Sequence, residues 1–164
     1  MIKLIVLDID GCMTNGQITY DANGLETKSF NVKDGLGIVT WLKMGGEAVI
    51  ITGRSSTIVE NRAKELGIKY LFQGIKEKGK ILSELMQQLH ISKEEVAAIG
   101  DDLNDLPMFE LAGTTFTPAD GMEIIQNKAT YVLNKKGGEG AIREMIDLIV
   151  LQNGQKKQFE SLWK

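Results

Sequence analysis

Apolar and polar positions along the chain follow two different periods. Short, nearly continuous apolar runs are typical of parallel strands buried on both faces. Longer stretches with apolar residues three and four positions apart are typical of helices with one buried face. Strands are predicted at 3–9, 47–52, 69–72, 95–99, 114–117 and 130–133. Helices are predicted from Asp34 to Gly45-Gly46, from Ser55-Ser56 to Gly67, and at about 77–89, 105–112 and 139–152.

Strands that alternate with helices predict an α/β fold, a Rossmann-like parallel sheet with helices on both faces. Residues 16–31 depart from this rhythm, and Asn23-Gly24 within them predicts a small β-hairpin flap after the first strand. We expect Asp34 to cap the helix that follows. The length suits a single domain, residues 1–164, with a polar tail at about 154–164. In that tail we expect Phe159, Leu162 and Trp163 to be exposed or to dock on another subunit.

Composition limits the compartment, the partners and the kind of metal site that are expected for such a domain. The single cysteine, Cys12, cannot form an internal disulfide, which suits a reducing cytoplasm. No apolar stretch approaches the ~18 residues that span a bilayer, so no membrane association is expected. A net charge of −3 argues against nucleic acid as a partner. The single histidine, His90, excludes a metal site built from several histidines.

Chemically active residues gather where three predicted strands end. The carboxyl ends of parallel strands share one edge of a sheet, where ligands bind. These residues are Asp8, Asp10 and Gly11 after the first strand, Thr52, Gly53 and Arg54 after the second, and Asp101, Asp102 and Asp105 after the strand at 95–99. Carboxylates so close together repel unless a cation lies between them, and oxygen ligands suit Mg²⁺. Any one of these groups alone would be an ordinary strand end, but together they predict a magnesium site.

The order of these residues resembles the motifs of the haloacid dehalogenase-like phosphatases. The segment Asp8-Ile9-Asp10-Gly11-Cys12-Met13-Thr14 resembles their DxDGxxT signature. Thr52 matches the second motif, and Gly100-Asp101-Asp102-x-x-Asp105 matches the fourth. A lysine is expected between these two, and Lys76, Lys78 and Lys80 compete for the role. We choose Lys78 because Gln73-Gly74-x-x-x-Lys78 resembles the family's Q-G-x-x-x-K stretch.

The resemblance implies a mechanism of phosphate ester hydrolysis. Asp8 would be the nucleophile that forms an aspartyl phosphate, and Asp10 the acid and base. Mg²⁺ would lie between Asp8, the backbone carbonyl of Asp10 and Asp101, supported by Asp102 or Asp105. The phosphoryl oxygens would be bound by Thr52, Gly53, Lys78 and Gly11. Cys12 is expected to be a small packed residue.

Spacing and local resemblance narrow the subfamily. The 41 residues between Asp10 and Thr52, and the 48 between Thr52 and Asp101, leave no room for an inserted cap domain. Residues 20–37 and 137–143 resemble segments of the 3-deoxy-D-manno-octulosonate 8-phosphate phosphatases. That resemblance implies a phosphorylated sugar acid as substrate, contacted by Arg54, Lys33 and Asp34, and a role in lipopolysaccharide biosynthesis. It also implies a homotetramer in which the hairpin and tail of one subunit cover a neighbour's site.

Two other functions are compatible with parts of the pattern. Phosphatases of nine-carbon 2-keto-3-deoxy sugar acid 9-phosphates share the capless plan, but the Thr52-Gly53-Arg54 stretch favours the eight-carbon substrate. Non-catalytic phospho-receiver signalling domains also collect acids, a threonine and a lysine at one edge of a sheet. Their phosphorylated aspartate follows the third strand, where this chain has Phe72-Gln73-Gly74. The receiver is therefore the remote alternative.

Overall fold

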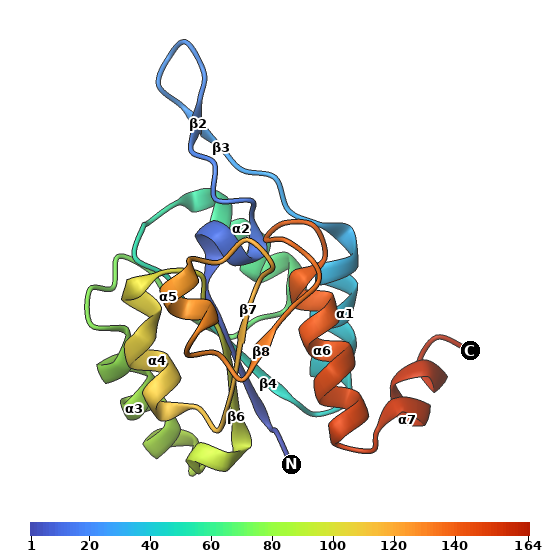
Figure 1. Cartoon of the computed structure of the whole chain (residues 1–164). Coiled ribbons are helices and arrows are strands. Elements are labelled where there is room, and N and C mark those ends of the chain that lie inside the picture. The colour runs from blue at the N-terminus through green and yellow to red at the C-terminus, as the bar shows by residue number, and fades with distance from the viewer.

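A six-stranded parallel sheet forms the centre of the computed structural model, which describes residues 1–164 (Figure 1). The strands lie in the order β5-β4-β1-β6-β7-β8, and every neighbouring pair is parallel. Their bounds are β1 (Leu4–Leu7), β4 (Glu47–Ile51), β5 (Tyr70–Phe72), β6 (Val96–Ile99), β7 (Thr114–Thr117) and β8 (Tyr131–Val132). The α/β fold predicted from the alternation of strands and helices is confirmed.

Helices cover both faces of the sheet, which explains the continuous apolar sequence of β1. Ile5 and Leu7 face a core shared with α1 (Val32–Lys43), α2 (Thr57–Leu66), α6 (Ala141–Gln152) and α7 (Lys156–Ser161). Leu4 and Val6 face the other core, under α3 (Lys78–Leu89), α4 (Leu106–Leu111) and α5 (Glu123–Gln126). None of these helices has the length and apolarity needed to cross a membrane.

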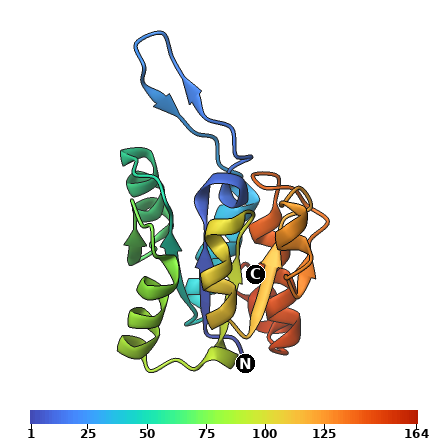
Figure 2. The same ribbon diagram turned by 60° about the vertical axis from the view of Figure 1, so that its left-hand side comes forward.

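A β-hairpin stands above the carboxyl end of the sheet, as Figures 1 and 2 show. Its strands, β2 (Thr19–Tyr20) and β3 (Glu26–Thr27), pair over only two residues each. The carboxylate of Asp21 accepts hydrogen bonds from the backbone of Asn23 and Leu25 and so closes the turn. Between β1 and β4 the chain forms only one further turn, this flap and α1. The predicted flap and the absence of a cap domain there are confirmed.

The prediction that Asp34 caps α1 is wrong. The helix begins at Val32, and the side chain of Asn31 accepts a hydrogen bond from the backbone of Lys33 at 2.8 Å. Asp34 lies buried in the first turn, where Oδ1 accepts a hydrogen bond from the backbone of Arg143 at 2.8 Å. Arg143 belongs to the first turn of α6, whose N-cap is a glycine without a side chain. Asp34 therefore caps a neighbouring helix.

The C-terminal segment forms α7 and folds back on its own subunit. Phe159 is only 8% exposed, and the guanidinium of Arg143 lies 5.5 Å from its ring centroid. The indole nitrogen of Trp163 donates a hydrogen bond to Thr40 Oγ1 at 3.0 Å, and the ammonium of Lys43 lies over its ring. The expected exposure is therefore wrong for Phe159, whereas Leu162 and Trp163 are 40% and 52% exposed as expected.

Phe159→Ala should lower the free energy of unfolding by about 2–3 kcal/mol, because a nearly buried aromatic ring would be lost from the α6–α7 contact. Urea denaturation measures this change. Leu151→Ala, at a 62% exposed position on α6, is the matched control and should cost less than about 0.5 kcal/mol. Equal losses in the two variants would show that α7 is not packed as described.

Candidate active site

The turn after β1 brings the backbone of Gly11 against the end of β6. The single helical turn η1 (Ile9–Met13) follows Asp8, and within it Gly11 has a φ of +97°. A Cβ atom at this position would lie 2.0 Å from Asp101 Oδ2, so only glycine fits. Thr14 Oγ1 accepts hydrogen bonds from the backbone of Gly11 and Gly16, which holds the turn in shape. The loops after β1 and β6 therefore meet closely.

Residues 137 and 138, compared above with a subfamily segment, pack directly on this turn. The backbone N–H of Gly138 donates a hydrogen bond to the carbonyl of Cys12 at 3.0 Å. A Cβ atom on Gly137 would lie within 1.9 Å of the carbonyl oxygen of Gly11. The backbone of the two glycines thus packs against the turn and supports it.

A buried ammonium joins two of the predicted carboxylates. Lys78 Nζ, at the first residue of α3, donates to Asp8 Oδ1 at 2.8 Å and to Asp105 Oδ1 at 2.7 Å. The other oxygen of Asp105 accepts a hydrogen bond from the backbone of Asp101 at 2.9 Å. The side chains of Lys78, Asp8 and Asp105 are at most 5% exposed. Because Lys76 and Lys80 are exposed, Lys78 is the lysine that the structure brings to the carboxylates.

The charges of this cluster do not balance without a cation. Burial, followed by the charge of Asp105, raises the pKa of Asp8 to about 7 despite the ion pair with Lys78. Burial, followed by the charges of Asp8 and Asp105, raises the pKa of Asp101 to about 8. Burial alone would lower the pKa of Lys78, but its two carboxylate partners outweigh burial and raise it. Three carboxylates and one ammonium leave two negative charges, which one divalent cation would neutralise.

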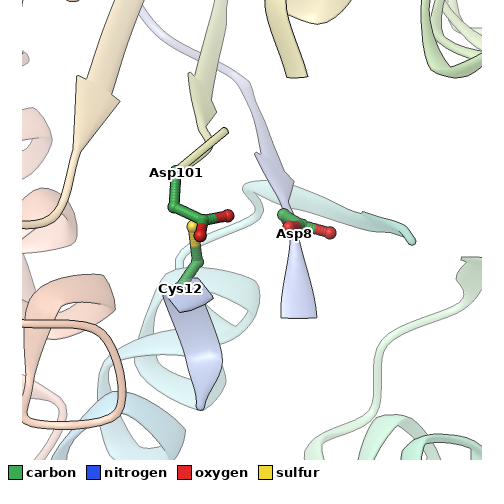
Figure 3. A group of neighbouring side chains, drawn as sticks. All are labelled: Asp8, Cys12 and Asp101. Atoms are coloured by element: carbon green, nitrogen blue, oxygen red, sulfur yellow. The ribbon is translucent and has the colours of Figure 1, made fainter. Parts of the chain in front are cut away.

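Asp8, Cys12 and Asp101 lie close enough to share one metal ion. One ligand atom from each side chain falls within 4.8 Å of the others, and Figure 3 shows them converging. Cys12 is fully buried, and burial raises the pKa of its thiol well above the usual value, so it is neutral. Mg²⁺ binds oxygen ligands in preference to a neutral thiol. The two carboxylates are therefore the side chains that fit Mg²⁺, and Cys12 forms the wall beside them.

The remaining predicted phosphate and metal residues lie around this cluster. Thr52 is buried at the end of β4, and Gly53 follows it at the surface. Asp102 is exposed and caps the short helical turn η3 (Leu103–Asp105), accepting from the backbone of Leu103 at 2.7 Å. Of the two supporting acids left open by the sequence, Asp105 is the one in contact with Lys78 and with the backbone of Asp101.

Two flap residues that the sequence analysis missed, Lys28 and Glu26, reach the site. Lys28 Nζ lies 2.5 Å from Asp10 Oδ1 and 3.2 Å from Glu26 Oε1. The guanidinium of Arg54 donates to Glu26 Oε1 at 2.8 Å and lies 3.9 Å from Asp10 Oδ2. Alternating charges on the returning strand of the hairpin were the available signal. Sequence alone does not fix how a hairpin folds over a sheet, so the contacts could not be assigned.

The structure does not bring Lys33 and Asp34 to this cluster. Lys33 is exposed and lines a cavity of about 540 Å³ between α6 and α7. Asp34 is buried at the start of α6, where desolvation raises the pKa of its carboxyl to about 6. Asp34 is only 2% exposed, so its carboxyl is not available to a ligand in this arrangement of α1.

Comparison with known proteins places this geometry in a family. Residues 71–146 match the model of the haloacid dehalogenase-like hydrolases. The chain is 42% identical over 160 residues to 3-deoxy-D-manno-octulosonate 8-phosphate phosphatase of Haemophilus influenzae, covering 98% of this chain and 89% of the relative. The chain belongs to the haloacid dehalogenase-like hydrolases. Its parallel sheet, the turn after β1 and the acidic strand ends are thus those of a hydrolase family.

Solved structures of this hydrolase family superpose closely on the chain. One is the phosphatase of the same name from Moraxella catarrhalis, solved with magnesium, phosphate and KDO, with a TM-score of 0.92 and 41% identity. The aligned region covers 98% of this chain and 93% of the chain in that structure. Another is the cobalt-bound phosphatase from Haemophilus influenzae, with a TM-score of 0.89 and 43% identity, covering 93% and 90%.

Metal-free protein should lose stability as the pH rises from about 4 to 8. The raised pKa values of Asp8 and Asp101 mean that the native state holds protons which the unfolded chain has released, so unfolding becomes easier with rising pH. Mg²⁺ replaces those protons and should raise the melting temperature more at pH 8 than at pH 5.5. Thermal denaturation of EDTA-treated protein, with and without Mg²⁺, measures both effects.

Asp101→Asn is the control for this prediction, because it removes one of the repelling carboxylates and one candidate ligand. This variant should show a weaker pH dependence and little response to Mg²⁺. A Mg²⁺ response in the wild-type protein that is equal at both pH values would contradict the charge imbalance described above.

Proposed function

We propose that this chain is a magnesium-dependent phosphatase that hydrolyses 3-deoxy-D-manno-octulosonate 8-phosphate to 3-deoxy-D-manno-octulosonate and phosphate. The observation that carries the proposal is the buried cluster of Asp8, Lys78, Asp101 and Asp105 at the carboxyl end of the sheet. Support for the substrate comes from the relatives of that name, which match nearly the whole chain at 42–43% identity. The KDO-bound relative from Moraxella catarrhalis adds to it.

Asp8 is the nucleophile in this proposal. One of its carboxylate oxygens bonds to phosphorus while the bond between phosphorus and the sugar oxygen breaks, which yields an aspartyl phosphate. Lys78 holds the other oxygen and so fixes the direction of attack. Asp10 gives its proton to the departing sugar oxygen. Asp10 then takes a proton from the water that attacks the phosphorus of the intermediate, which releases phosphate and restores Asp8.

The metal ligands in this proposal are the carboxylates of Asp8 and Asp101 and the backbone carbonyl of Asp10. A bound Mg²⁺ supplies positive charge that lets a carboxylate and a phosphate dianion approach each other. Asp105 orients Lys78 and the backbone of Asp101, and exposed Asp102 shapes the loop. Thr52, Gly53, Gly11 and Lys78 bind the phosphoryl oxygens.

Arg54 is the substrate-binding residue that the geometry supports at the mouth of the site. Its side chain is 44% exposed, and its guanidinium lies beside Asp10, where it can pair with the carboxylate of a sugar acid. Lys33 is exposed and so available to a substrate, whereas buried Asp34 is assigned to capping α6. The reaction would belong to the synthesis of a lipopolysaccharide sugar in the cytoplasm.

Phosphate release from a panel of substrates tests the function. We expect 3-deoxy-D-manno-octulosonate 8-phosphate to give the highest kcat/KM among eight- and nine-carbon sugar acid phosphates and simple sugar phosphates. Asp8→Asn should lower kcat at least about 1,000-fold while the circular dichroism spectrum stays unchanged. EDTA should stop turnover, and Mg²⁺ should restore it.

Each departure from that result points to a different error. A higher kcat/KM for a nine-carbon sugar acid 9-phosphate would show that this compound, and not the eight-carbon one, is the substrate. Wild-type activity in the Asp8→Asn variant would show that Asp8 is not the nucleophile. A stable aspartyl phosphate with no turnover on any ester would favour the receiver-like alternative.

The flap also supports a homotetramer, in which it would cover a neighbour's open site. A hairpin of two-residue strands is marginal by itself. Ile18, Tyr20 and Leu25 on it are 40%, 55% and 65% exposed, which leaves apolar surface for a partner. Figure 2 shows that the outer end of the hairpin extends away from the rest of its own subunit.

Light scattering coupled to size-exclusion chromatography should give the mass of four chains. Leu25→Asp, at the tip of the flap, should shift the distribution toward smaller species because a charge would enter the contact. Leu151→Asp, equally exposed on α6, is the control and should leave the mass unchanged. A fully active wild-type monomer would contradict the role of the flap as a cover.

A further inference from the structure

The flap delivers one positive charge to the acid and base candidate. The ammonium of Lys28 lies 2.5 Å from Asp10 Oδ1, and its side chain is only 2% exposed. Glu26 Oε1, at 3.2 Å, is its second carboxylate partner. A buried ammonium is costly unless carboxylates surround it, so this position depends on both partners. Lys28 is therefore held against Asp10 rather than left free in solvent.

The contacts of Lys28 make the two oxygens of Asp10 unequal. Oδ1 is occupied by Lys28, whereas Oδ2 has only a longer contact of 3.9 Å with Arg54 Nε. Arg54 in turn holds Glu26, so the four side chains form a closed ring of alternating charge. The Asp10 side chain remains 19% exposed. Oδ2 is thus the oxygen with room to meet a ligand.

We propose that Lys28 is a positioning residue, which fixes the orientation of Asp10 so that Oδ2 exchanges protons during catalysis. The inference rests on the proposed function, in which Asp10 is the acid and base. Oδ2 gives its proton to the departing sugar oxygen and later receives one from the attacking water, while Lys28 stays hydrogen-bonded to Oδ1. Because Lys28 belongs to the flap, Asp10 is correctly oriented only when the flap is in place over the site.

A simple anchor for the flap would behave differently from a positioning residue. Loss of an anchor would raise KM and lower stability, and it would affect every substrate equally. Loss of a positioning residue affects the steps in which Asp10 moves a proton. A departing sugar alkoxide needs that proton, whereas 4-nitrophenolate leaves without it. Hydrolysis of the aspartyl phosphate needs Asp10 as a base with either substrate.

Stopped-flow and rapid-quench kinetics of the full chain with Mg²⁺ separate these steps. With the sugar acid phosphate, Lys28→Met should lower kcat about 100-fold, with KM within about threefold of wild type. With 4-nitrophenyl phosphate, the same variant should release about one nitrophenolate per site at nearly the wild-type rate and then turn over slowly. Lys28→Arg, which keeps the charge, should recover kcat to within about fivefold.

Lys69→Met is the matched control, because Lys69 is exposed just before β5 and lies outside the site. It should leave both reactions unchanged. A Lys28→Met variant that loses the burst and the steady state equally, with a raised KM, would make Lys28 an anchor only. Unchanged kinetics in that variant would remove any role.

Crystal structures of the wild-type protein and Lys28→Met give a readout that does not depend on turnover. In the variant the Asp10 side chain should leave its wild-type rotamer, and an unchanged rotamer would overturn the inference. If the wild-type enzyme hydrolyses neither ester, the proposed function fails. The position of Asp10 in the two crystals still decides whether Lys28 orients it.

Discussion

The buried ammonium of Lys78, shared between Asp8 and Asp105, is the interaction on which the site depends. It joins the first turn of α3 to the loops that follow β1 and β6, so three separate segments meet at one atom. One ammonium cannot balance three carboxylates in a region with little water, and the raised pKa values of Asp8 and Asp101 express that deficit. The protein therefore builds an incomplete charge cluster, which a divalent cation completes.

Backbone contacts make this concentration of charge possible. Gly11 lets the turn after β1 approach Asp101 closely, and Gly137 lets the loop before α6 pack against the same turn. Asp34 fixes the start of α6 through the backbone of Arg143 and so steadies the loop that carries Gly137. The resemblance implied that Asp34 contacts the substrate. In the structure Asp34 is buried and affects the site only indirectly, because it holds the start of α6.

The sheet, its two cores and the carboxylates at its edge could be predicted because each follows from local pattern. Apolar runs give β1, β4 and β6, and parallel strands place Asp8, Thr52 and Asp101 at one edge. Other features depend on choices that sequence leaves open. Asn31 and Asp34 both carry an N-cap signal, and tertiary packing selects Asn31. Likewise, Phe159 and Trp163 lie in a polar segment whose helix forms against α1 and α6.

The flap contributes a second charge arrangement with the opposite character. In the ring of Asp10, Lys28, Glu26 and Arg54 each positive group has a negative neighbour, so the mouth of the site has no excess charge. By contrast, the cluster of Asp8, Asp101, Asp105 and Lys78 has three negative charges and only one positive charge. An anionic sugar acid phosphate therefore meets a neutral entrance in which Glu26 already occupies Arg54. If Arg54 binds the substrate's carboxylate as proposed, that carboxylate would have to displace Glu26, while Lys28 would keep Asp10 in place for proton transfer.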